Sequence, residues 1–352
     1  MPLLDRRTSA FITRFKERAL PDDLQWSYLP SGGEGHELVK DFLNQHYVDA
    51  EPSDQPHAIF SDDDIQRLFL VDASWPKTIR QIAPQLSLAV IHKTTRQLVA
   101  VALVRPSRIR YQGVDSMVAS IPVVCIDQSY RHSPLAAILL AKCYRQLRQH
   151  CLADGALFFG YRRPFHCLHS ADSYCIDLQQ QEEQVYTKPV LSDYILQPYS
   201  QRDTGQVIQL INTHNDQEVI HPLYNDADYF YQRFRHYGNI CSYCIVDLQR
   251  KVVGWFALRK PDDTDTGASR TPVTLFAWAG QGLSAVDVTY FALRQALLMK
   301  ARYLYLPYDM AFNDENQQRL QIKTANPQQA YAISTLFYEE AIHIKLFDPW
   351  VV

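Results

Sequence analysis

The sequence predicts an α/β fold of two lobes, each built on a mixed, twisted sheet flanked by helices. Three observations predict it. β-hairpin patterns of equal length occur at residues 87–106 and 242–261, the same order of segments follows each of them, and a helical pattern precedes each of them. In both hairpins two apolar runs flank a polar turn, as expected for paired strands. A plan that is repeated at long range indicates a pseudo-two-fold internal repeat.

The remaining elements of the two copies follow in the same order. Apolar residues recur at every third or fourth position of residues 135–151 and 285–300, which predicts amphipathic helices. A strand is expected on each side of these helices, and one further helix before each hairpin. These elements are expected at residues 37–46, 118–126 and 156–161 in the first copy, and at residues 204–212, 273–279 and 302–306 in the second.

A polar stretch rich in Gln and Glu, residues 179–184, has no apolar period and is typical of a link between lobes. We therefore expect an N-terminal extension over residues 1–20, a first lobe over residues 21–190 and a second lobe over residues 191–352.

Composition and charge exclude several classes of protein. The chain has 352 residues, of which 47% are hydrophobic and 21% charged, enough for about two domains with a large core. A formal net charge of -3 gives no overall attraction to nucleic acid. No run reaches the roughly 20 apolar residues of a membrane span, and the start has no signal-peptide pattern. We expect a soluble, cytoplasmic monomer without a nucleic-acid partner.

The seven cysteines are an odd number and lie mostly in apolar runs, which favours reduced thiols in a core. Two clusters leave a metal or redox role open. Residues 241–244 have the C-x-x-C spacing within a strand-like run, and His166, Cys167 and His169, followed by Cys175, offer nitrogen and sulfur atoms that suit zinc. Neither cluster matches a standard zinc template, so ordinary packing is favoured and no metal site is predicted.

One junction of a strand with a helix has the chemistry of an anion site. Its residues are Arg131, His132, Ser133, Pro134, Leu135 and Ala136. The first turn of a helix has unbonded N–H groups and the positive end of the helix dipole, and both favour a phosphate. Arg131 and His132 add basic side chains, and Pro134 suits a first helical turn although it has no N–H. The alternative is an ordinary capped start of a helix.

Several strings resemble, in the same order along the chain, those of the protein N-myristoyltransferase family, which has a tandem GNAT-like fold. They lie at residues 43–49, 74–76, 117–126, 130–139, 160–164, 196–198 and 251–261. The resemblance covers nearly the whole chain from about residue 20 and is carried by the order of the strings. It implies two fused GNAT-like lobes, of which the first binds acyl-CoA and the second binds an acceptor peptide.

The resemblance also implies roles for individual residues. The backbone amides of Val123 and Val124 would form an oxyanion hole for the thioester oxygen. The terminal carboxylate of Val352 would take the proton of the attacking amine. Residues 131–136 would bind myristoyl-CoA, which is a co-substrate and not a permanent cofactor. Tyr47 and Asp49 would meet a peptide acceptor.

The sequence departs from the family at several of these places. Ser120 and Pro122 replace a glutamate and an asparagine, Phe158 replaces a threonine, and Pro134 replaces a glycine. Cys125, next to the oxyanion pair, leaves a covalent cysteine mechanism as an alternative.

Three hypotheses follow. The first is transfer of a fatty acyl group from acyl-CoA to a protein amine, with an N-terminal glycine as the expected acceptor. The second is a GNAT-like transferase that uses a shorter acyl-CoA or another amine. The third is a non-catalytic relative that binds a peptide.

Overall fold

The computed structural model describes residues 19–29, 32–47, 60–111, 114–149, 155–160, 168–171, 174–180, 193–213, 219–260, 273–306, 310, 314–320, 322–324, 331–335 and 343–344. The chain divides into two compact units. Unit 1 consists of Met1–Ile109, Val114–His169 and Ala332–Ile342, and unit 2 of Arg110–Gly113, Ser170–Tyr331 and His343–Val352.

The sheet of unit 1 has the strand order β1-β2-β3-β4-β5-β15. β1, β2 and β3 are antiparallel neighbours, whereas β4 and β5 are parallel, because helix α5 carries the chain back between them. The strands are β1 (Leu24–Tyr28), β2 (Leu88–His92), β3 (Leu98–Tyr111), β4 (Val114–Ile126), β5 (Gly155–Gly160) and β15 (Tyr331–Thr335). β6 (Leu168–Ala171) follows β15 in the same order.

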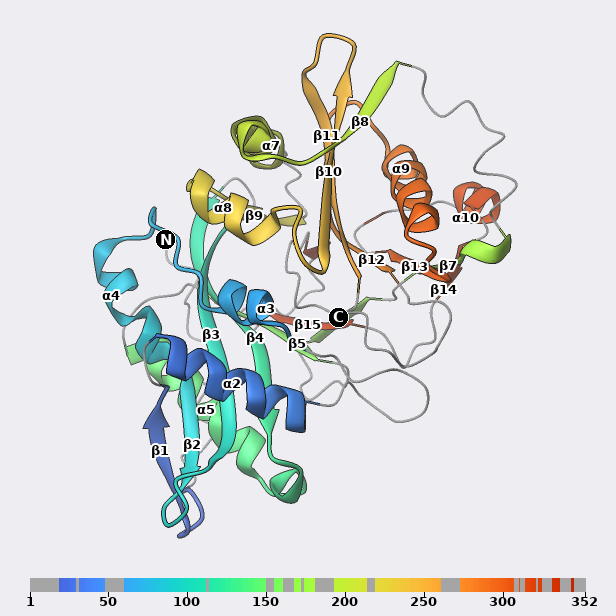
Figure 1. Ribbon diagram of the computed structural model, residues 1–352. Coiled ribbons are helices and arrows are strands. Elements are labelled where there is room, and N and C mark those ends of the chain that lie inside the picture. The colour runs from blue at the N-terminus through green and yellow to red at the C-terminus, as the bar shows by residue number, and fades with distance from the viewer. Residues whose placement is uncertain are drawn as a thin grey trace. The chain divides into compact units, whose positions relative to one another are not determined.

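Helices cover both faces of this sheet. α2 and α3 lie on one face and α5 on the other (Figure 1). Leu135, Leu139 and Cys143 of α5 are spaced by four residues and fully buried, as the amphipathic pattern predicts. The helices of unit 1 are α2 (Gly33–His46), α3 (Asp62–Leu68), α4 (Lys77–Leu86) and α5 (Leu135–Gln149).

The sheet of unit 2 repeats the plan in the order β14-β7-β13-β12-β11-β10-β8, with β12 and β13 parallel. Its strands are β7 (Tyr174–Asp177), β8 (Tyr194–Pro198), β10 (Ile240–Asp247), β11 (Val252–Arg259), β12 (Val273–Gly280), β13 (Tyr303–Leu306) and β14 (Lys323–Thr324). A short parallel pair joins β9 (Val219–Leu223) to β16 (His343–Ile344). α7 (Thr204–Thr213) and α9 (Ala285–Leu298) lie on opposite faces (Figure 1), and α8 (Ala227–Phe234) and α10 (Asp314–Leu320) complete the unit.

An aromatic cluster in unit 2 surrounds Trp255 of β11, which has no exposed surface. The centroid of its indole lies 5.5 Å from that of Phe230 and 5.2 Å from that of Phe234, both on α8. The ring centroid of Tyr199 is 6.4 Å away. These tilted and edge-on contacts are the arrangements that aromatic rings prefer, so α8 is held to the sheet largely by this cluster.

The predicted repeat and the mixed α/β fold are confirmed. Segment β2-β3-β4-α5-β5 of unit 1 corresponds in order to β10-β11-β12-α9-β13 of unit 2. Every element predicted for the two copies is present, although β3 and β4 are longer than expected.

The predicted lobe boundary after residue 190 does not follow the pairing of the strands. β5 pairs with β15, which lies near the end of the sequence, and β13 pairs with β7, which lies in its first half. Each of the two predicted lobes therefore contributes one strand to the sheet that otherwise belongs to the other lobe. Strand pairing is fixed by backbone hydrogen bonds, and apolar alternation within a strand does not identify its neighbour.

Helix α9 begins with a reciprocal cap, which supplies a first testable prediction. Ser284 Oγ accepts from the N–H of Asp287 at 3.2 Å, and Asp287 Oδ2 accepts from the N–H of Ser284 at 2.8 Å. We expect Ser284→Ala to lower the free energy of unfolding by about 1 kcal/mol, because a helix N–H loses its acceptor. Urea unfolding followed by circular dichroism measures this. Ser284→Thr, which keeps the acceptor and the hydroxyl that donates to Asp287 Oδ2, should stay near the wild type; equal losses in both variants would contradict the assignment.

None of the helices in the described part of the chain has both the length and the apolar character needed to cross a bilayer.

Candidate functional site

The candidate site lies in unit 1, where β4 extends beyond its pairing with β5. The two strands pair in parallel over Val118–Ile121 and Gly155–Phe158. The next residue of β4 is Pro122, which has no N–H to donate and therefore stops the ladder. β4 continues to Ile126, so its last residues extend beyond the pairing with β5.

The two predicted oxyanion residues lie in this extension. Val123 is buried and Val124 is half-buried. Successive N–H groups of an extended strand point to opposite edges. The N–H of Asp127 donates to the carbonyl of Val99 on β3 at 2.8 Å. By this alternation the N–H of Val124 points away from β3, toward the edge at which β5 pairs with the earlier residues of β4. By the same alternation the N–H of Val123 faces β3, and the oxyanion hole formed by both amides stays a prediction.

The turn between β4 and α5 is organised by Ser133. Its hydroxyl donates to the carbonyl of Tyr130 at 2.6 Å and accepts from the N–H of Leu135 at 3.3 Å. Leu135 is fully buried and anchors the helix start in the core. Ser133 therefore caps one of the first N–H groups of α5 and leaves others unbonded.

The first helical hydrogen bond of α5 runs from the N–H of Ile138 to the carbonyl of Pro134, at 3.0 Å. The amides of Ala136 and Ala137 come before this bond, and both residues are exposed. No acidic residue lies in the first turn of α5. Pro134 fits at the start of the helix, where its missing N–H costs no hydrogen bond. The amides of two exposed residues at a helix start, with no acidic residue in that helical turn, are suited to an anion.

Arg131 is exposed, but its guanidinium is already engaged. Its Nε donates to the carbonyl of Ile126 at 3.4 Å, and its Nη2 donates to the carbonyl of His46 at the end of α2. A cation at the C-terminal end of a helix is favourable. The structure thus gives Arg131 a role in joining α2 to the turn, and its contact with a phosphate stays a prediction. His132 is exposed in the same turn.

His46 and Asp127 are two residues of this junction that the sequence pattern did not single out. His46 Nε2 lies 3.7 Å from Asp127 Oδ2, and His46 Nδ1 accepts from the N–H of Gln128 at 3.5 Å. Burial alone would raise the pKa of Asp127, but hydrogen bonds from Ser129 outweigh it and lower that pKa. The Asp-x-Ser spacing at the end of a strand is a signal of such a turn.

The predicted acceptor residue Tyr47 directly follows α2. Its N–H donates to the carbonyl of Leu43 at 2.7 Å, and its ring meets that of Phe60 edge-on, with the centroids 5.2 Å apart. Tyr47 is thus adjacent to His46, whose carbonyl accepts from Arg131. The predicted residues Asp49 and Val352 lie outside the described part of the chain.

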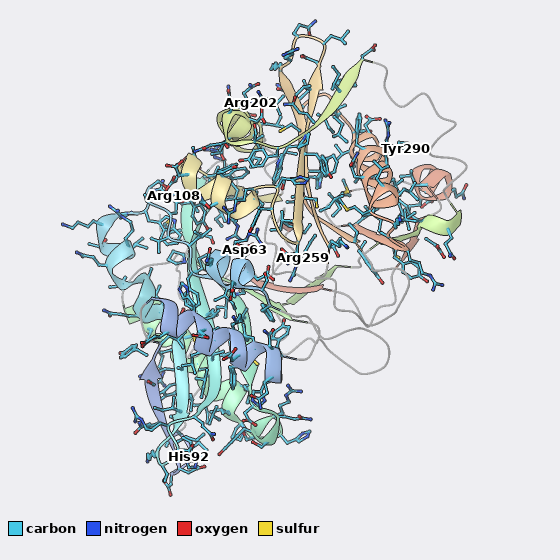
Figure 2. All side chains as sticks on the ribbon, viewed as in Figure 1. Asp63, His92, Arg108, Arg202, Arg259 and Tyr290 are labelled. Atoms are coloured by element: carbon cyan, nitrogen blue, oxygen red, sulfur yellow. The ribbon has the colours of Figure 1, made fainter. Side chains whose placement is uncertain are left out.

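A second tie joins the turn to the hairpin of β2 and β3. The hydroxyl of Tyr130 donates to Asp23 Oδ2 at 3.0 Å, and His92 Nε2 lies 3.8 Å from the same oxygen. His92 lies at the turn end of β2 (Figure 2). Burial and the bond to Asp23 raise the pKa of Tyr130. The start of α5 is therefore positioned from two sides.

Cys125 does not have the properties of a nucleophile. Its side chain is 4% exposed, and burial raises the pKa of its thiol to about 12, against a smaller opposing effect of Arg131. The reactive thiolate is thus nearly absent at neutral pH.

We therefore expect Cys125→Ala to retain acyl transfer to within about threefold, since cavity and packing effects remain but no covalent step is lost. The initial rate of CoA release measures this. Leu139→Ala, a truncation of another buried side chain of unit 1, serves as the packing control. A loss of about 10³-fold in Cys125→Ala alone would restore the covalent mechanism.

The sequence clusters considered for metal do not form a site in the described residues, which contain no group of three or more suitable ligands. Cys241 and Cys244 are three residues apart in β10, so their side chains point to opposite faces of the sheet. Burial raises the pKa of both thiols. His166 and Cys167 lie outside the described residues, and Cys175 is half-buried on β7.

The amino-terminal part of the chain, residues 5–160, matches the family profile described as "Myristoyl-CoA:protein N-myristoyltransferase, N-terminal domain". This part is similar to the N-terminal domain of N-myristoyltransferases. It runs from the first strand to β5 and therefore contains the whole junction of β4 with α5. The resemblance inferred from the sequence is confirmed.

Solved N-myristoyltransferase structures share the fold over nearly the whole chain. One from Saccharomyces cerevisiae with bound myristoyl-CoA has a TM-score of 0.70 and 13% identity, covering 95% of this chain and 87% of that one. Another from that organism, with myristoyl-CoA and inhibitors, has a TM-score of 0.72 and 13% identity, covering 96% and 85%. A search of curated proteins by sequence gives no match. The two-lobed N-myristoyltransferase fold therefore extends through unit 2, at low sequence identity.

Proposed function

We propose that this chain is an N-acyltransferase that moves the acyl group of myristoyl-CoA to a protein amine, with an N-terminal glycine as acceptor. One observation carries the proposal. The exposed residues Ala136 and Ala137 lie in the first turn of α5, which follows the part of β4 that extends beyond its pairing with β5, within the segment that matches the N-myristoyltransferase N-terminal domain. An acyl-CoA needs these two features, a phosphate site and a backbone edge for its thioester.

The residues of the junction take the following roles in the proposal. The first turn of α5 binds CoA phosphate, with Arg131, His132 and Ser133 around it. The N–H of Val124 holds the thioester oxygen as negative charge develops there. Leu135 and the cap by Ser133 keep the helix start in place.

The reaction itself is a substitution at the thioester carbon. The acceptor nitrogen forms the new C–N bond, the C–S bond breaks, and CoA leaves with the bonding pair as a thiolate that takes up a proton. The amine gives up its proton to the terminal carboxylate of Val352 as general base. Tyr47 and Asp49 contact the acceptor peptide. We further propose that the chain acts as a cytoplasmic monomer.

A second reading, a relative that binds a peptide without turnover, is favoured by the engagement of Arg131 with two carbonyls. That engagement leaves less of the guanidinium for a phosphate. The helix amides do not depend on Arg131, so acyl transfer remains the better-supported function.

Turnover tests the proposal directly. The purified chain is incubated with myristoyl-CoA and a peptide that begins with glycine, and the free thiol and the mass of the peptide are followed. We expect thiol release with a matching mass gain on the peptide. The same peptide with an acetylated amine is the control and should stay unmodified. Release of thiol from acetyl-CoA alone would favour a shorter-chain transferase, and no release from either donor would overturn the proposal.

A further inference from the structure

An asparagine near the end of α2 holds the chain just before α3 by two hydrogen bonds. Asn44 Nδ2 donates to the carbonyl of Phe60 at 3.1 Å, and Asn44 Oδ1 accepts from the N–H of Phe60 at 2.7 Å. One side-chain amide thus pairs with both backbone groups of a single residue. We call this pair of bonds the asparagine latch.

The same latch occurs in unit 2, where α7 is the counterpart of α2 in the repeat. Asn212 Nδ2 donates to the carbonyl of Tyr224 at 2.6 Å, and Asn212 Oδ1 accepts from the N–H of Tyr224 at 3.1 Å. In both units the latched residue is a buried aromatic one. It lies shortly before the N-cap of the next helix, which is Ser61 for α3 and Asp226 for α8. The latch therefore belongs to the repeated fold, and unit 2 holds a second copy for comparison.

The latch of unit 1 lies beside Tyr47, the predicted acceptor residue. The ring of Tyr47 meets the ring of Phe60 edge-on, with the centroids 5.2 Å apart. Phe60 is buried and held by the latch, whereas Tyr47 is half-buried and leaves α2 with an extended backbone. The fixed ring of Phe60 is thus a wall against which the ring of Tyr47 rests.

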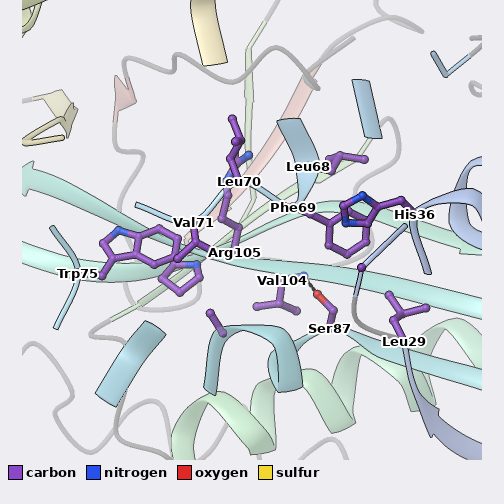
Figure 3. Close-up of a pocket in the computed structure, with 13 residues that line it drawn as sticks. Leu29, His36, Leu68, Phe69, Leu70, Val71, Trp75, Ser87, Val104 and Arg105 are labelled. Carbon is purple, nitrogen blue, oxygen red and sulfur yellow. Dashed lines mark hydrogen bonds between the residues drawn. The ribbon is translucent and has the colours of Figure 1, made fainter. Parts of the chain in front are cut away.

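α2 and α3 are also held together at the other end of α2. The imidazole of His36 stacks on Phe69, directly after α3, with the centroids 4.5 Å apart and the planes 19° apart (Figure 3). His36 and Asn44 lie roughly 12 Å apart along the helix, at about 1.5 Å per residue. The two contacts can therefore be removed separately, and the latch is the one beside Tyr47.

Asn44 itself is exposed, so its side chain is not part of the packed core. Truncating it removes two hydrogen bonds without opening a cavity in that core. The effect of the latch on Tyr47 can therefore be measured in a chain that stays folded.

We propose that Asn44 is a positioning residue for the acceptor peptide, because it fixes Phe60 and thereby holds the ring of Tyr47 in place. The inference rests on the proposed function, in which Tyr47 contacts the acceptor. Asn44 has no contact with the reacting atoms in that function. Its loss should weaken binding of the acceptor and leave the acyl-CoA site as it is.

Steady-state kinetics with myristoyl-CoA and a peptide that begins with glycine test this role. We expect Asn44→Ala to raise the KM of the peptide by about tenfold, the size of one or two net hydrogen bonds, with kcat within about threefold. The Kd of myristoyl-CoA, measured by calorimetry, should change by less than about threefold. An unchanged KM of the peptide, or an equal loss of affinity for myristoyl-CoA, would overturn the proposal.

Two control variants separate the latch beside Tyr47 from a general loosening of the fold. Asn212→Ala removes the same two bonds in unit 2, and His36→Ala loosens the pair of α2 and α3 at its other end. Each should change the KM of the peptide by less than about threefold. A rise in either control as large as that in Asn44→Ala would overturn the proposal.

Amide hydrogen exchange tests the latch itself and does not depend on turnover. In Asn44→Ala the N–H of Phe60 loses its acceptor and should exchange at least about tenfold faster, while the N–H of Tyr224 should not change. Unchanged exchange at Phe60 would overturn the latch. A wild-type chain without turnover would instead overturn the proposed acyl transfer, and with it the acceptor role of Tyr47, whatever the exchange at Phe60.

Discussion

Ala136→Asp is expected to weaken myristoyl-CoA binding by about tenfold or more while slightly stabilising the fold. Ala136 is exposed in the first turn of α5, and its N–H precedes the first helical hydrogen bond, from Ile138 to Pro134. A carboxylate at this place repels a CoA phosphate, and juxtaposed like charges cost several kcal/mol. The same carboxylate stabilises the start of a helix by about 0.3–1 kcal/mol. Affinity and stability should therefore change in opposite directions.

Calorimetric titration and thermal melting of the same preparations measure the two effects. Ala136→Asn is the matched control, since it has the size of aspartate without the charge, and we expect it to lose less than about threefold in affinity. If aspartate and asparagine weaken binding equally, the effect is steric. If neither weakens it, phosphate does not bind at the start of α5.

Trp255→Ala is expected to have the largest effect on stability, a loss of about 3–5 kcal/mol. The indole has no exposed surface and contacts Phe230, Phe234 and Tyr199, so its removal leaves a cavity between β11 and α8. A loss of this size approaches the whole stability of many domains.

Urea unfolding followed by far-ultraviolet circular dichroism measures this loss and does not depend on the fluorescence of the deleted tryptophan. Leu298→Ala is the control, because Leu298 ends α9 and is 62% exposed, and it should change stability by at most about 0.5 kcal/mol. Similar effects in the two variants would contradict the assignment of Trp255 to the centre of this aromatic cluster.

The elements of both units could be predicted from the sequence because their signals are local. Polar turns between apolar runs gave both hairpins, and the spacing of Leu135, Leu139 and Cys143 gave the buried face of α5. The exchange of β15 and β7 between the sheets could not be predicted. These short strands are joined to their partners only by hydrogen bonds between distant parts of the chain.

The candidate site was predictable in part, for similar reasons. The order of strand, turn and helix predicted an anion site at residues 131–136, and Ala136 is exposed in the structure. The contact between Arg131 and the carbonyl of His46 was not predictable, because the two residues are 85 positions apart in the sequence. Pro122 was visible as a departure from the family, but its effect on the ladder with β5 needed the register.

Calorimetric titration of the purified chain with myristoyl-CoA and acetyl-CoA in parallel tests the central claim most directly. The account predicts that myristoyl-CoA binds at one site and much more tightly than acetyl-CoA, because the long apolar chain adds burial to the shared phosphate contacts. Equal affinity for both would indicate a transferase that does not select a fatty chain. Binding of neither would contradict the assignment of the β4–α5 junction as an acyl-CoA site.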